Sequence, residues 1–420
     1  MLKRWGVHPT ENKLHKPAEI AALPEQLIIP LVQHCGAPAE PLVKEGDKVK
    51  QYQKIAGSEE NVSASIHAPA SGTVRTGETT LPNGRQCKGI IIDTDKEQEH
   101  VELEKKDPDK LSAEEMIDKI KEAGIVGMGG AGFPTHVKLR NTTELFILNG
   151  CECEPYLSAD HMTMLEHPEK VIKGLKIMMR IVGAKNAVLG IENNKKDAAE
   201  KLEKFLESNM KIRLLKTWYP QGSEKHLVHA ITGRKVHCGK IPCHIGITVN
   251  NVATAKAVYD AVYEGIPLTE RIVTVTGDLN DPKNLVARIG TSGTHLINEC
   301  GGMKGNPSKV IYGGPMMGHS QDTSDNPIIK TTGGIIVMDN PQVNSPSACI
   351  RCGRCVQVCP MNLMPTTIAR YSEMERYNMA DQYYAKDCIE CGCCAYVCPS
   401  KIPLVQLIRD AKCGIDADKG

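Results

Sequence analysis

The segment 349-CIRCGRCVQVCP-360 returns as 388-CIECGCCAYVCP-399 near the C-terminal end of the chain. Both copies follow the pattern Cys-x-x-Cys-x-x-Cys-x-x-x-Cys-Pro. Each cysteine of the first copy has its counterpart 39 positions later, so the segment is an internal repeat. Three thiolates at two-residue gaps can surround one corner of a metal cluster. The fourth thiolate, set apart by a longer gap and followed by proline, points away from them.

This spacing predicts two [4Fe–4S] clusters. In two-cluster ferredoxins the fourth cysteine of each run ligates the other cluster. One cluster is therefore assigned to Cys349, Cys352, Cys355 and Cys398, and the other to Cys388, Cys391, Cys394 and Cys359. Zinc is the alternative, but a structural zinc site takes four ligands in pairs, not two runs of four. Cys393 is a surplus thiol, because a register that used it would break the repeat.

Length and composition limit the class of protein. A chain of 420 residues is expected to form two to four domains. With 51 Lys and Arg against 50 Asp and Glu, the chain lacks the basic surplus of a nucleic-acid binder. It has no run of 18 apolar residues, so we expect no transmembrane segment. The first six residues lack the apolar core of a secretory signal, and cluster thiolates require a reducing compartment. We therefore expect a multi-domain protein on the cytoplasmic side.

Residues 1–100 have the pattern of short strands separated by turns. Segments 41–50 and 68–74 each place a turn between alternating apolar positions. This arrangement resembles the barrel-sandwich fold of biotinyl and lipoyl domains. The segment 59–63 between the two halves has no lysine to carry a swinging arm, so an unmodified docking or scaffolding module is expected. The polar segment 93–110 is interpreted as a linker.

A glycine-rich loop follows the first predicted helix. That helix begins after Ser112, which with Glu115 fits a capping box, and it ends at 123–124. The next segment, 127-GMGGAGFPT-135, has four glycines within six residues. It matches G-x-G-x-x-G, but the dinucleotide fingerprint follows a strand and opens a helix. We therefore expect a loop whose backbone approaches a flat or phosphorylated ligand, with a merely tight turn as the alternative.

The middle of the chain alternates strands and helices. A strand at 144–148 runs into polar residues at 149–155, the position where α/β sheets place ligands. The strand at 246–249 ends in 250-NNVAT-254, which can cap a helix or hold a phosphate. The elements expected between these strands are helices at 167–182 and 195–208 and strands at 187–191 and 212–218. Residues 267–342 return to β character with a helix near 294–300, and 341–346 is a short linker.

These loops together resemble a known family. The segments 127–138, 149–155, 219–233 and 249–254 recur in this order in the flavin-carrying, NADH-oxidising subunit of respiratory complex I. Within that superfamily, the leading Gly6-Val7-His8-Pro9, the barrel-sandwich and the tandem cysteine runs are similar to the RnfC family of the Rnf complex. The resemblance covers essentially the full chain.

The resemblance implies an α/β multi-domain architecture with four units. They are a barrel-sandwich at 1–100, an α/β FMN/NADH-binding domain at 111–265, a β-grasp (SLBB) domain at 267–342 and a two-[4Fe–4S] ferredoxin-like domain at 343–413. It also implies non-covalent FMN, NAD(H) as substrate, ferredoxin-linked carriers and Rnf subunits as partners, no nucleic acid, and a peripheral position on the cytoplasmic face of the membrane.

The resemblance also implies roles for single residues. The glycine loop and Lys138 would lie along FMN, whose phosphate would meet the residues after the 246–249 strand. Asn149 and Glu152 would contact the flavin, while Glu154 and Glu224 would meet the nicotinamide nucleotide. The implied flavin-loop and phosphate residues are Gly127, Gly129, Gly130, Gly132, Asn250, Asn251 and Thr254. Surface or helix-start carboxylates are the alternative for Glu154 and Glu224, and a solvated lysine is the alternative for Lys138.

Three functions follow from these observations. The first is an electron-transfer subunit that exchanges electrons between NAD(H) and ferredoxin-linked carriers through FMN and two clusters. The second is a cobalamin reductase of the microcompartment type, which shares the flavin loops. The third is a non-catalytic electron wire or scaffold, which stays open because Cys151 and Ser223 stand where the family has an aspartate and a glutamate.

Overall fold

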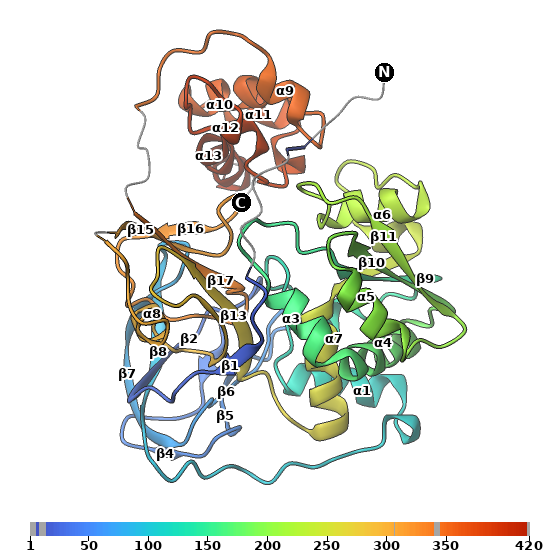
Figure 1. Ribbon diagram of the computed structural model, residues 1–420, viewed down its shortest axis with the longest axis vertical. Helices are drawn as coiled ribbons and strands as arrows, with labels where there is room; N and C mark the ends of the chain where they lie inside the picture. Colours follow the sequence, from blue (N-terminus) through green and yellow to red (C-terminus); the bar gives the residue numbers. More distant parts are fainter. Residues whose placement is uncertain (1–5, 8–13, 306, 340–344, 418–420) are drawn as a thin grey trace.

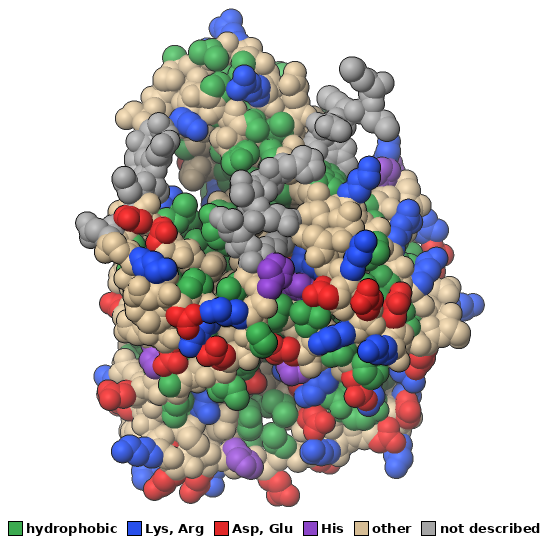
Figure 2. Space-filling view, in the orientation of Figure 1, with side chains coloured by type: hydrophobic (Ala, Val, Ile, Leu, Met, Phe, Trp, Pro, Cys, Tyr) green, Lys and Arg blue, Asp and Glu red, His purple; other side chains and the backbone are tan. Residues whose placement is uncertain are grey.

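The computed structural model of the chain describes residues 6–7, 14–305, 307–339 and 345–417 (Figure 1). His8 and Pro9 of the N-terminal motif and most of the expected linker 341–346 lie outside the described residues. Two β-rich units lie beside an α/β unit, and a small helical unit sits above them (Figure 1). Basic and acidic side chains are interspersed over the face shown in Figure 2.

The N-terminal unit is a pair of small sheets packed face to face. One sheet has the order β2 (Gln26–Pro30), β8 (Gln86–Thr94), β7 (Gly72–Thr80), β4 (Lys48–Val49), and the other β3 (Glu40–Pro41), β5 (Lys54–Gly57), β6 (Ile66–His67). Alternate residues point inward, so Leu27 and Ile29 of one strand meet Ile90 and Ile92 of its neighbour in a common core. The barrel-sandwich expected for this region is confirmed.

The α/β unit is built on a parallel sheet of order β11-β10-β9-β12. Its strands are β9 (Leu145–Gly150), β10 (Asn186–Glu192), β11 (Met210–Leu215) and β12 (Ile247–Asn251). Its longer helices are α1 (Ala113–Glu122), α3 (Ala159–Glu166), α4 (Pro168–Val182), α5 (Lys196–Glu203), α6 (Glu224–Thr232) and α7 (Val252–Tyr259). Shorter elements are α2 (Thr135–Lys138), the 3₁₀ turns Pro108–Lys110 and Pro242–Ile245, and the π-helical turn Asp260–Glu264.

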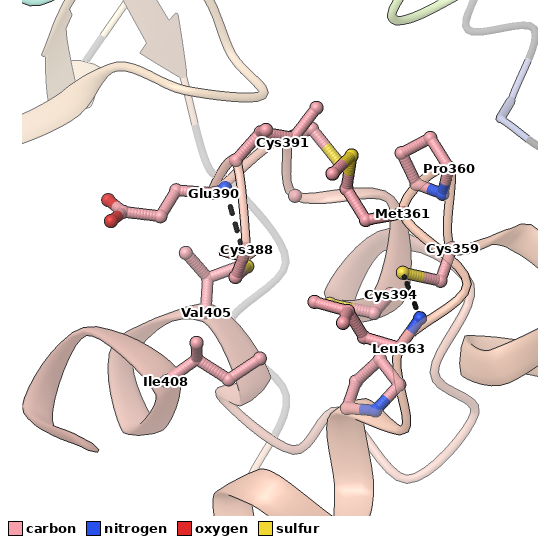
Figure 3. A pocket seen from close by; sticks show the side chains of 13 residues that line it. Cys359, Pro360, Met361, Leu363, Cys388, Glu390, Cys391, Cys394, Val405 and Ile408 are labelled. Atoms are coloured by element: carbon pink, nitrogen blue, oxygen red, sulfur yellow. Dashed lines mark hydrogen bonds between the residues drawn. The ribbon is translucent and has the colours of Figure 1, made fainter. Parts of the chain in front are cut away.

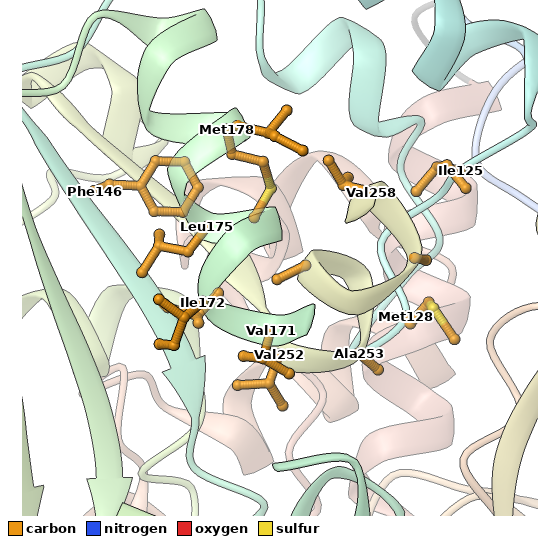
Figure 4. Close-up of a cluster of buried hydrophobic side chains, with 14 of the residues drawn as sticks. Ile125, Met128, Phe146, Val171, Ile172, Leu175, Met178, Val252, Ala253 and Val258 are labelled. Atoms are coloured by element: carbon orange, nitrogen blue, oxygen red, sulfur yellow. The ribbon is translucent and has the colours of Figure 1, made fainter. Parts of the chain in front are cut away.

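Helices cover both faces of this sheet. Phe146 and Leu148 of β9 pack against α4 and α7 on one face, and Ile147 packs against α6 on the other. Figure 4 shows Phe146 beside Leu175 and Met178 of α4. The helices α4 and α7 cross so closely that a Cβ on Gly174 would overlap the carbonyl oxygen of Ala255. The strand β11 ends earlier than expected, α5 is shorter, and the sequence did not indicate α3 as a separate helix.

The third unit is a six-stranded mixed sheet. Its order is β1 (Ala18–Ile20), β14 (Lys283–Arg288), β13 (Glu270–Gly277), β17 (Gly334–Asp339), β15 (Pro307–Tyr312), β16 (His319–Gln321), with α8 (Gly293–Glu299) packed on it. The strand β1 pairs with β14, so this sheet takes its edge strand from the first twenty residues of the chain. The sequence pattern did not indicate this long-range pairing.

The helical unit repeats its backbone as well as its cysteines. It contains α9 (Arg354–Val358), α10 (Pro365–Glu373), α11 (Tyr377–Gln382), the 3₁₀ turn Ala385–Asp387, α12 (Cys393–Tyr396) and α13 (Leu404–Ala417). Arg351 and Glu390 occupy equivalent positions in the two runs and have φ of 55° and 56°. Gly353 and Gly392 have φ of 73° and 76°. Each run therefore makes the same left-handed turns around its thiols. Across the described residues, no helix is long and apolar enough to cross a bilayer.

Lys330 ties the three larger units together. Its side chain is 1% exposed, and its ammonium donates to the carbonyls of Ser65 and Gly124, each at 2.7 Å. Its backbone N–H donates to Gln33 Oε1 at 3.2 Å. Burial lowers the pKa of Lys330 to about 7.

Stability should therefore depend on pH through Lys330. The folded protein binds fewer protons here than the unfolded chain between pH about 7 and the ordinary lysine value of 10.5. The contribution of Lys330 to the free energy of unfolding must rise with pH across that window. We expect the melting temperature of the wild type to rise relative to that of Lys330→Met as pH increases from about 7 to about 10. The exposed Lys48→Met serves as control, and a difference that stays constant with pH would contradict the assignment.

Candidate functional site: two thiol cavities and a glycine loop

The cysteines of the two runs line two separate cavities. The first, here called the inner cavity, encloses about 350 Å³ that is partly open to solvent (Figure 3). Its thiols come from Cys359 of the first run and from Cys388, Cys391 and Cys394 of the second. Backbone N–H groups donate to two of them, from Leu363 to Cys359 Sγ at 3.3 Å and from Glu390 to Cys388 Sγ at 3.4 Å. The Glu390 carboxylate points away from the cavity in Figure 3 and pairs with Arg409 and Lys412.

The second, here called the outer cavity, has the complementary set of thiols. It encloses about 590 Å³, also partly open, and is lined by Cys349, Cys352, Cys355 and Cys398. The Arg351 N–H donates to Cys349 Sγ at 3.4 Å, the counterpart of the Glu390 contact in the inner cavity. The structure thus brings each predicted set of four cysteines together, with the fourth thiol taken from the other run.

The donor sets fit iron–sulfur clusters chemically. Each cavity offers four thiols and backbone N–H groups directed at sulfur, which are the contacts that hold such clusters and tune them. Among the described residues no group of three or more Cys, His, Asp or Glu lies close enough to hold a single metal ion. The two findings are compatible, because the ligands of a cubane each bind a different iron and stand farther apart. Burial raises the pKa of Cys388 to about 11, so loading must release its proton.

The two cavities differ in their surroundings. Several contacts join the inner side of the helical unit to the rest of the described chain. The Gly6 N–H donates to the Val358 carbonyl at 2.9 Å, and His226 Nε2 donates to the Pro360 carbonyl at 3.1 Å. The Gly239 N–H donates to the Asp387 carboxylate at 3.1 Å. Gly392 packs on the Met316 carbonyl. The outer cavity instead has an exposed rim, with Ile350 68% exposed and Arg351 and Arg354 open to solvent.

The glycine loop lies at the carboxyl end of the parallel sheet. The Gly127 N–H donates to the Phe133 carbonyl at 2.9 Å, which closes the loop, and the Met128 N–H donates to Thr254 Oγ1 at 3.0 Å. Gly129 lies against the side chain of Asn251. At Gly132, with φ of 71°, the loop packs on Gln33 and His34 of the barrel-sandwich. Gly130 and its neighbours are exposed, and a Cβ at Gly130 would meet nothing within 4 Å.

Two strand ends lie beside this loop. Asn149 of β9 is opposite Asn251 of β12 in the register. The Asn149 side chain accepts from the Cys151 N–H at 3.0 Å and donates to the Gly222 carbonyl at 2.8 Å, so it joins two of the family's loops. Asn251 caps α7 by accepting from the Ala253 N–H at 2.8 Å. The Asn250 side chain lies on the other side of the strand, where it is buried against Met178 Sδ at 3.6 Å. The structure therefore brings Asn251 and Thr254 to the loop but not Asn250.

The predicted carboxylates have structural partners in this state. Glu152 accepts from the backbone N–H groups of Asp160 and His161 at 3.0 and 3.1 Å, which places it at the start of α3. Glu154 accepts from the N–H groups of Met316 and Met317 at 3.1 and 2.8 Å. Glu224 forms an ion pair with Lys138. Of these contacts, only the Lys138–Glu224 pair joins two charged side chains, and both of them are partly exposed.

Two residues near the loop were missed. Asp160 accepts from Asn251 Nδ2 at 2.6 Å. Desolvation first, and the neighbouring Glu152 carboxylate second, raise the pKa of Asp160 to about 7. No local pattern indicated it, because α3 was not predicted. Phe133 is 40% exposed, and an aromatic residue between the glycines and Pro134 was an available signal, since the chain has only three phenylalanines.

Family models match the chain in four consecutive segments. They are the RnfC barrel-sandwich hybrid domain at 3–97, the Nuo51 FMN-binding domain at 120–260, the SLBB domain at 272–319 and a 4Fe–4S dicluster domain at 348–402. The FMN-binding match contains the glycine loop and both asparagine-bearing strand ends. The dicluster match contains all eight cavity cysteines. The expected fold class is confirmed.

Curated relatives match over almost the whole chain. The C subunit of the proton-translocating ferredoxin:NAD(+) oxidoreductase complex of Clostridium ljungdahlii is 46% identical, over 98% of this chain and 94% of its own. The C subunit of the Na(+)-translocating ferredoxin:NAD(+) oxidoreductase complex of Acetobacterium woodii is 41% identical, over 99% of this chain and 97% of its own. Neither of these relatives is named as a cobalamin reductase, and that alternative receives no support.

A solved structure shares the fold at lower similarity. The NAD+-reducing [NiFe]-hydrogenase in its H2-reduced state superposes with a TM-score of 0.50 at 18% identity, over 73% of this chain and 63% of that one. This likeness concerns the fold alone. The near full-length identity to the two curated relatives, with the four domain matches in order, shows that the chain belongs to the RnfC family, which supplies the C subunit of the Rnf complex, an ion-translocating oxidoreductase.

Proposed function

We propose that this chain exchanges electrons between NAD(H) and ferredoxin-linked carriers through non-covalent FMN and two [4Fe–4S] clusters. It would do so as a peripheral subunit on the cytoplasmic face of the membrane, bound to the other subunits of an Rnf-type complex. We also propose that 1–100, 111–265, 267–342 and 343–413 act as its domains. The observation that carries the proposal is that one chain holds two four-thiol cavities and an exposed glycine loop. FMN, when bound, converts the two-electron chemistry of a nicotinamide into the single electrons that clusters accept.

The chain's own residues supply position and charge. Gly129 and Gly130 leave their side of the loop without side chains, which lets a flat ring lie against the backbone. Asn149 and Asn251 hold the loop and the adjacent segments in place. The Met128–Thr254 hydrogen bond fixes the loop to the first turn of α7, whose N–H groups favour an anionic phosphate. The exposed ring of Phe133 offers a stacking surface to a nucleotide base or nicotinamide.

The Lys138–Glu224 pair supports a role in nucleotide binding. Both side chains are partly exposed, so the pair can open at little cost. Lys138 would then contact the electron-rich flavin or its phosphate, and Glu224 would accept hydrogen bonds from ribose hydroxyls or the carboxamide. Glu154 can contribute only if it exchanges its contacts with Met316 and Met317. We therefore assign the nucleotide contact chiefly to Glu224.

The position of the cavities suggests the order of transfer. The inner cavity adjoins the segments that contact the FMN-binding unit, whereas the outer cavity opens to solvent beside Ile350, Arg351 and Arg354. We propose that electrons pass between the flavin and the inner cluster, then the outer cluster, then the partner. The basic rim would favour a partner surface rich in acidic residues.

The decisive experiment is anaerobic mixing of the loaded protein with NADH while the flavin and cluster absorbances are recorded. We expect both to bleach, with the flavin change leading. Protein that retains clusters but releases no flavin on heating, and that does not respond to NADH, would support the wire or scaffold instead. Reduction by dithionite serves as the reference for fully reduced clusters.

Replacing Glu224 with glutamine should weaken use of NADH much more than reduction by dithionite. The change replaces a charged carboxylate by a neutral amide of almost the same shape. It therefore weakens the hydrogen bonds that the side chain would accept from the nucleotide. We expect at least about a tenfold loss in kcat/KM for NADH with an artificial acceptor, equivalent to about 1.4 kcal/mol. Glu200→Gln, on the exposed side of α5, is the matched control. An equal loss of NADH-driven and dithionite-driven cluster reduction would indicate misfolding.

A further inference from the structure

Tyr219 has a buried hydroxyl without a partner. The residue is 1% exposed, and its hydroxyl forms no hydrogen bond within the part of the chain that the structure describes. A buried donor left unpaired is costly, so such groups usually have a partner in the functional state. This hydroxyl is the polar end of one of the largest fully buried side chains in the protein.

The ring lies at the junction between the flavin loops and the inner cavity. It packs in one cluster with Val7, Cys391 and Cys393, against which Cys153 and Met316 are also packed. Cys391 lines the inner cavity, and Cys153 Sγ accepts from the Gly222 N–H at 3.3 Å in the adjacent flavin loop. Tyr219 therefore packs against a thiol of the inner cavity and against Cys153, whose sulfur is bound to the loop that contains Tyr219.

The backbone holds Tyr219 in this position. Its N–H and carbonyl exchange two hydrogen bonds with Val7, each of 3.0 Å, and Gly6 is bound in turn to Val358 next to Cys359. The tyrosine is thus fixed both to the flavin loop that contains it and to the helical unit. Because the ring is also fully buried, its hydroxyl does not reach solvent in this structure.

The ionisable groups that act on the Tyr219 hydroxyl are the Glu154 carboxylate and the thiols of Cys153, Cys391 and Cys393. The neighbouring carboxylate of Glu154 already accepts from two backbone N–H groups. Cys391, once it is a cluster ligand, is a thiolate and accepts hydrogen bonds, as do the inorganic sulfides of the cluster. We propose that Tyr219 donates a hydrogen bond to a sulfur atom of the inner cluster and thereby raises its reduction potential. This inference rests on the proposed function, and it assigns a tuning role to a residue of the flavin loop.

The sign of the effect follows from charge. A donor to cluster sulfur stabilises the more negative reduced state, so its removal lowers the potential. Tyr219→Phe removes only the hydroxyl and keeps the ring. In anaerobically reconstituted full-length protein we expect unchanged iron content and a lower midpoint potential for one cluster in an EPR-monitored titration. The other cluster and the flavin should titrate as in the wild type. The shifted signal should be the one that is absent from Cys359→Ser.

The controls separate the outcomes. Tyr312→Phe alters another buried tyrosine, whose hydroxyl bonds to the Asn326 carbonyl at 2.6 Å in the six-stranded sheet, and should leave both cluster potentials unchanged. A Tyr219→Phe variant that shifts only the flavin potential would place the hydroxyl on the flavin and overturn the inference. A variant that shifts no potential would overturn it too. Failure of the wild type to bind clusters would instead refute the proposed function.

Discussion

Cys359→Ser is expected to abolish the cluster that is otherwise held by Cys388, Cys391 and Cys394. Cys359 lies in the first cysteine run, yet its thiol lines the inner cavity with the three thiols of the second. Iron should fall from about eight atoms per chain to about four, because each [4Fe–4S] cluster contributes four. Iron and sulfide analysis measures the loss, and EPR identifies which of the two signals disappears.

The pairing of signals makes this test specific. Cys359→Ser should remove the same signal as Cys391→Ser, whereas Cys398→Ser should remove the same signal as Cys352→Ser. These variants are best made with Cys393→Ala, since the buried Cys393 thiol lies beside Cys391 and could replace a lost ligand. If Cys359→Ser instead removed the signal that depends on Cys352, each run would hold its own cluster and the cross-ligation would be wrong.

Gly130→Val should release FMN without unfolding the protein. A Cβ at Gly130 meets no atom within 4 Å in the protein alone, so the new side chain has room unless a ligand occupies it. If the flavin ring lies along the loop, the valine methyl groups would overlap it, and we expect at least about a hundredfold weaker FMN binding, or about 2.7 kcal/mol. Fluorescence of heat-released flavin gives the content, and titration of the flavin-free protein gives the affinity.

The melting temperature of flavin-free protein is the control for Gly130→Val. It should match that of the wild type, and both clusters should be retained. Gly222→Ala provides the contrast, because its Cβ would overlap the Cys151 carbonyl oxygen and should lower stability as well as flavin content. Full retention of FMN by Gly130→Val would mean that the ligand does not approach this part of the loop.

Features with local causes could be predicted from the sequence. The Ser112–Glu115 capping box forms as expected, because both of its partners lie within one helical turn. Likewise, Asn251 caps α7, as the segment 250–254 suggested. The cysteines could be grouped into two sets because the spacing of the repeat matches that of two-cluster ferredoxins, in which the fourth cysteine of each run joins the other set. In each case the interacting residues are neighbours in the chain or follow a strict repeat.

Features with distant causes could not be predicted. At the start of α3, the side chain of Glu152 accepts hydrogen bonds from the N–H groups of Asp160 and His161. Glu152 reaches them because of the path of the loop that precedes the helix, which the sequence pattern did not indicate. The role of Glu154 at a nucleotide stays a prediction, and the local pattern did not indicate that its carboxylate accepts hydrogen bonds from a turn of the six-stranded sheet. Asn250 is the exception, because the alternation of side chains along β12 could have indicated that it and Asn251 point to opposite faces.

The segment Gly6–Val7 connects two structural units, and this limits how far they can move relative to each other. It forms backbone hydrogen bonds with Tyr219 on one side and with Val358 on the other. It therefore holds the ferredoxin-like unit against the unit that matches the FMN-binding domain. The distance between the proposed flavin and the inner cluster would then stay constant. Electron transfer between them would not require the ferredoxin-like unit to dock and dissociate in each turnover. The rate of this step would then be independent of solvent viscosity. Only the encounter between the exposed rim of the outer cavity and the partner protein would depend on diffusion.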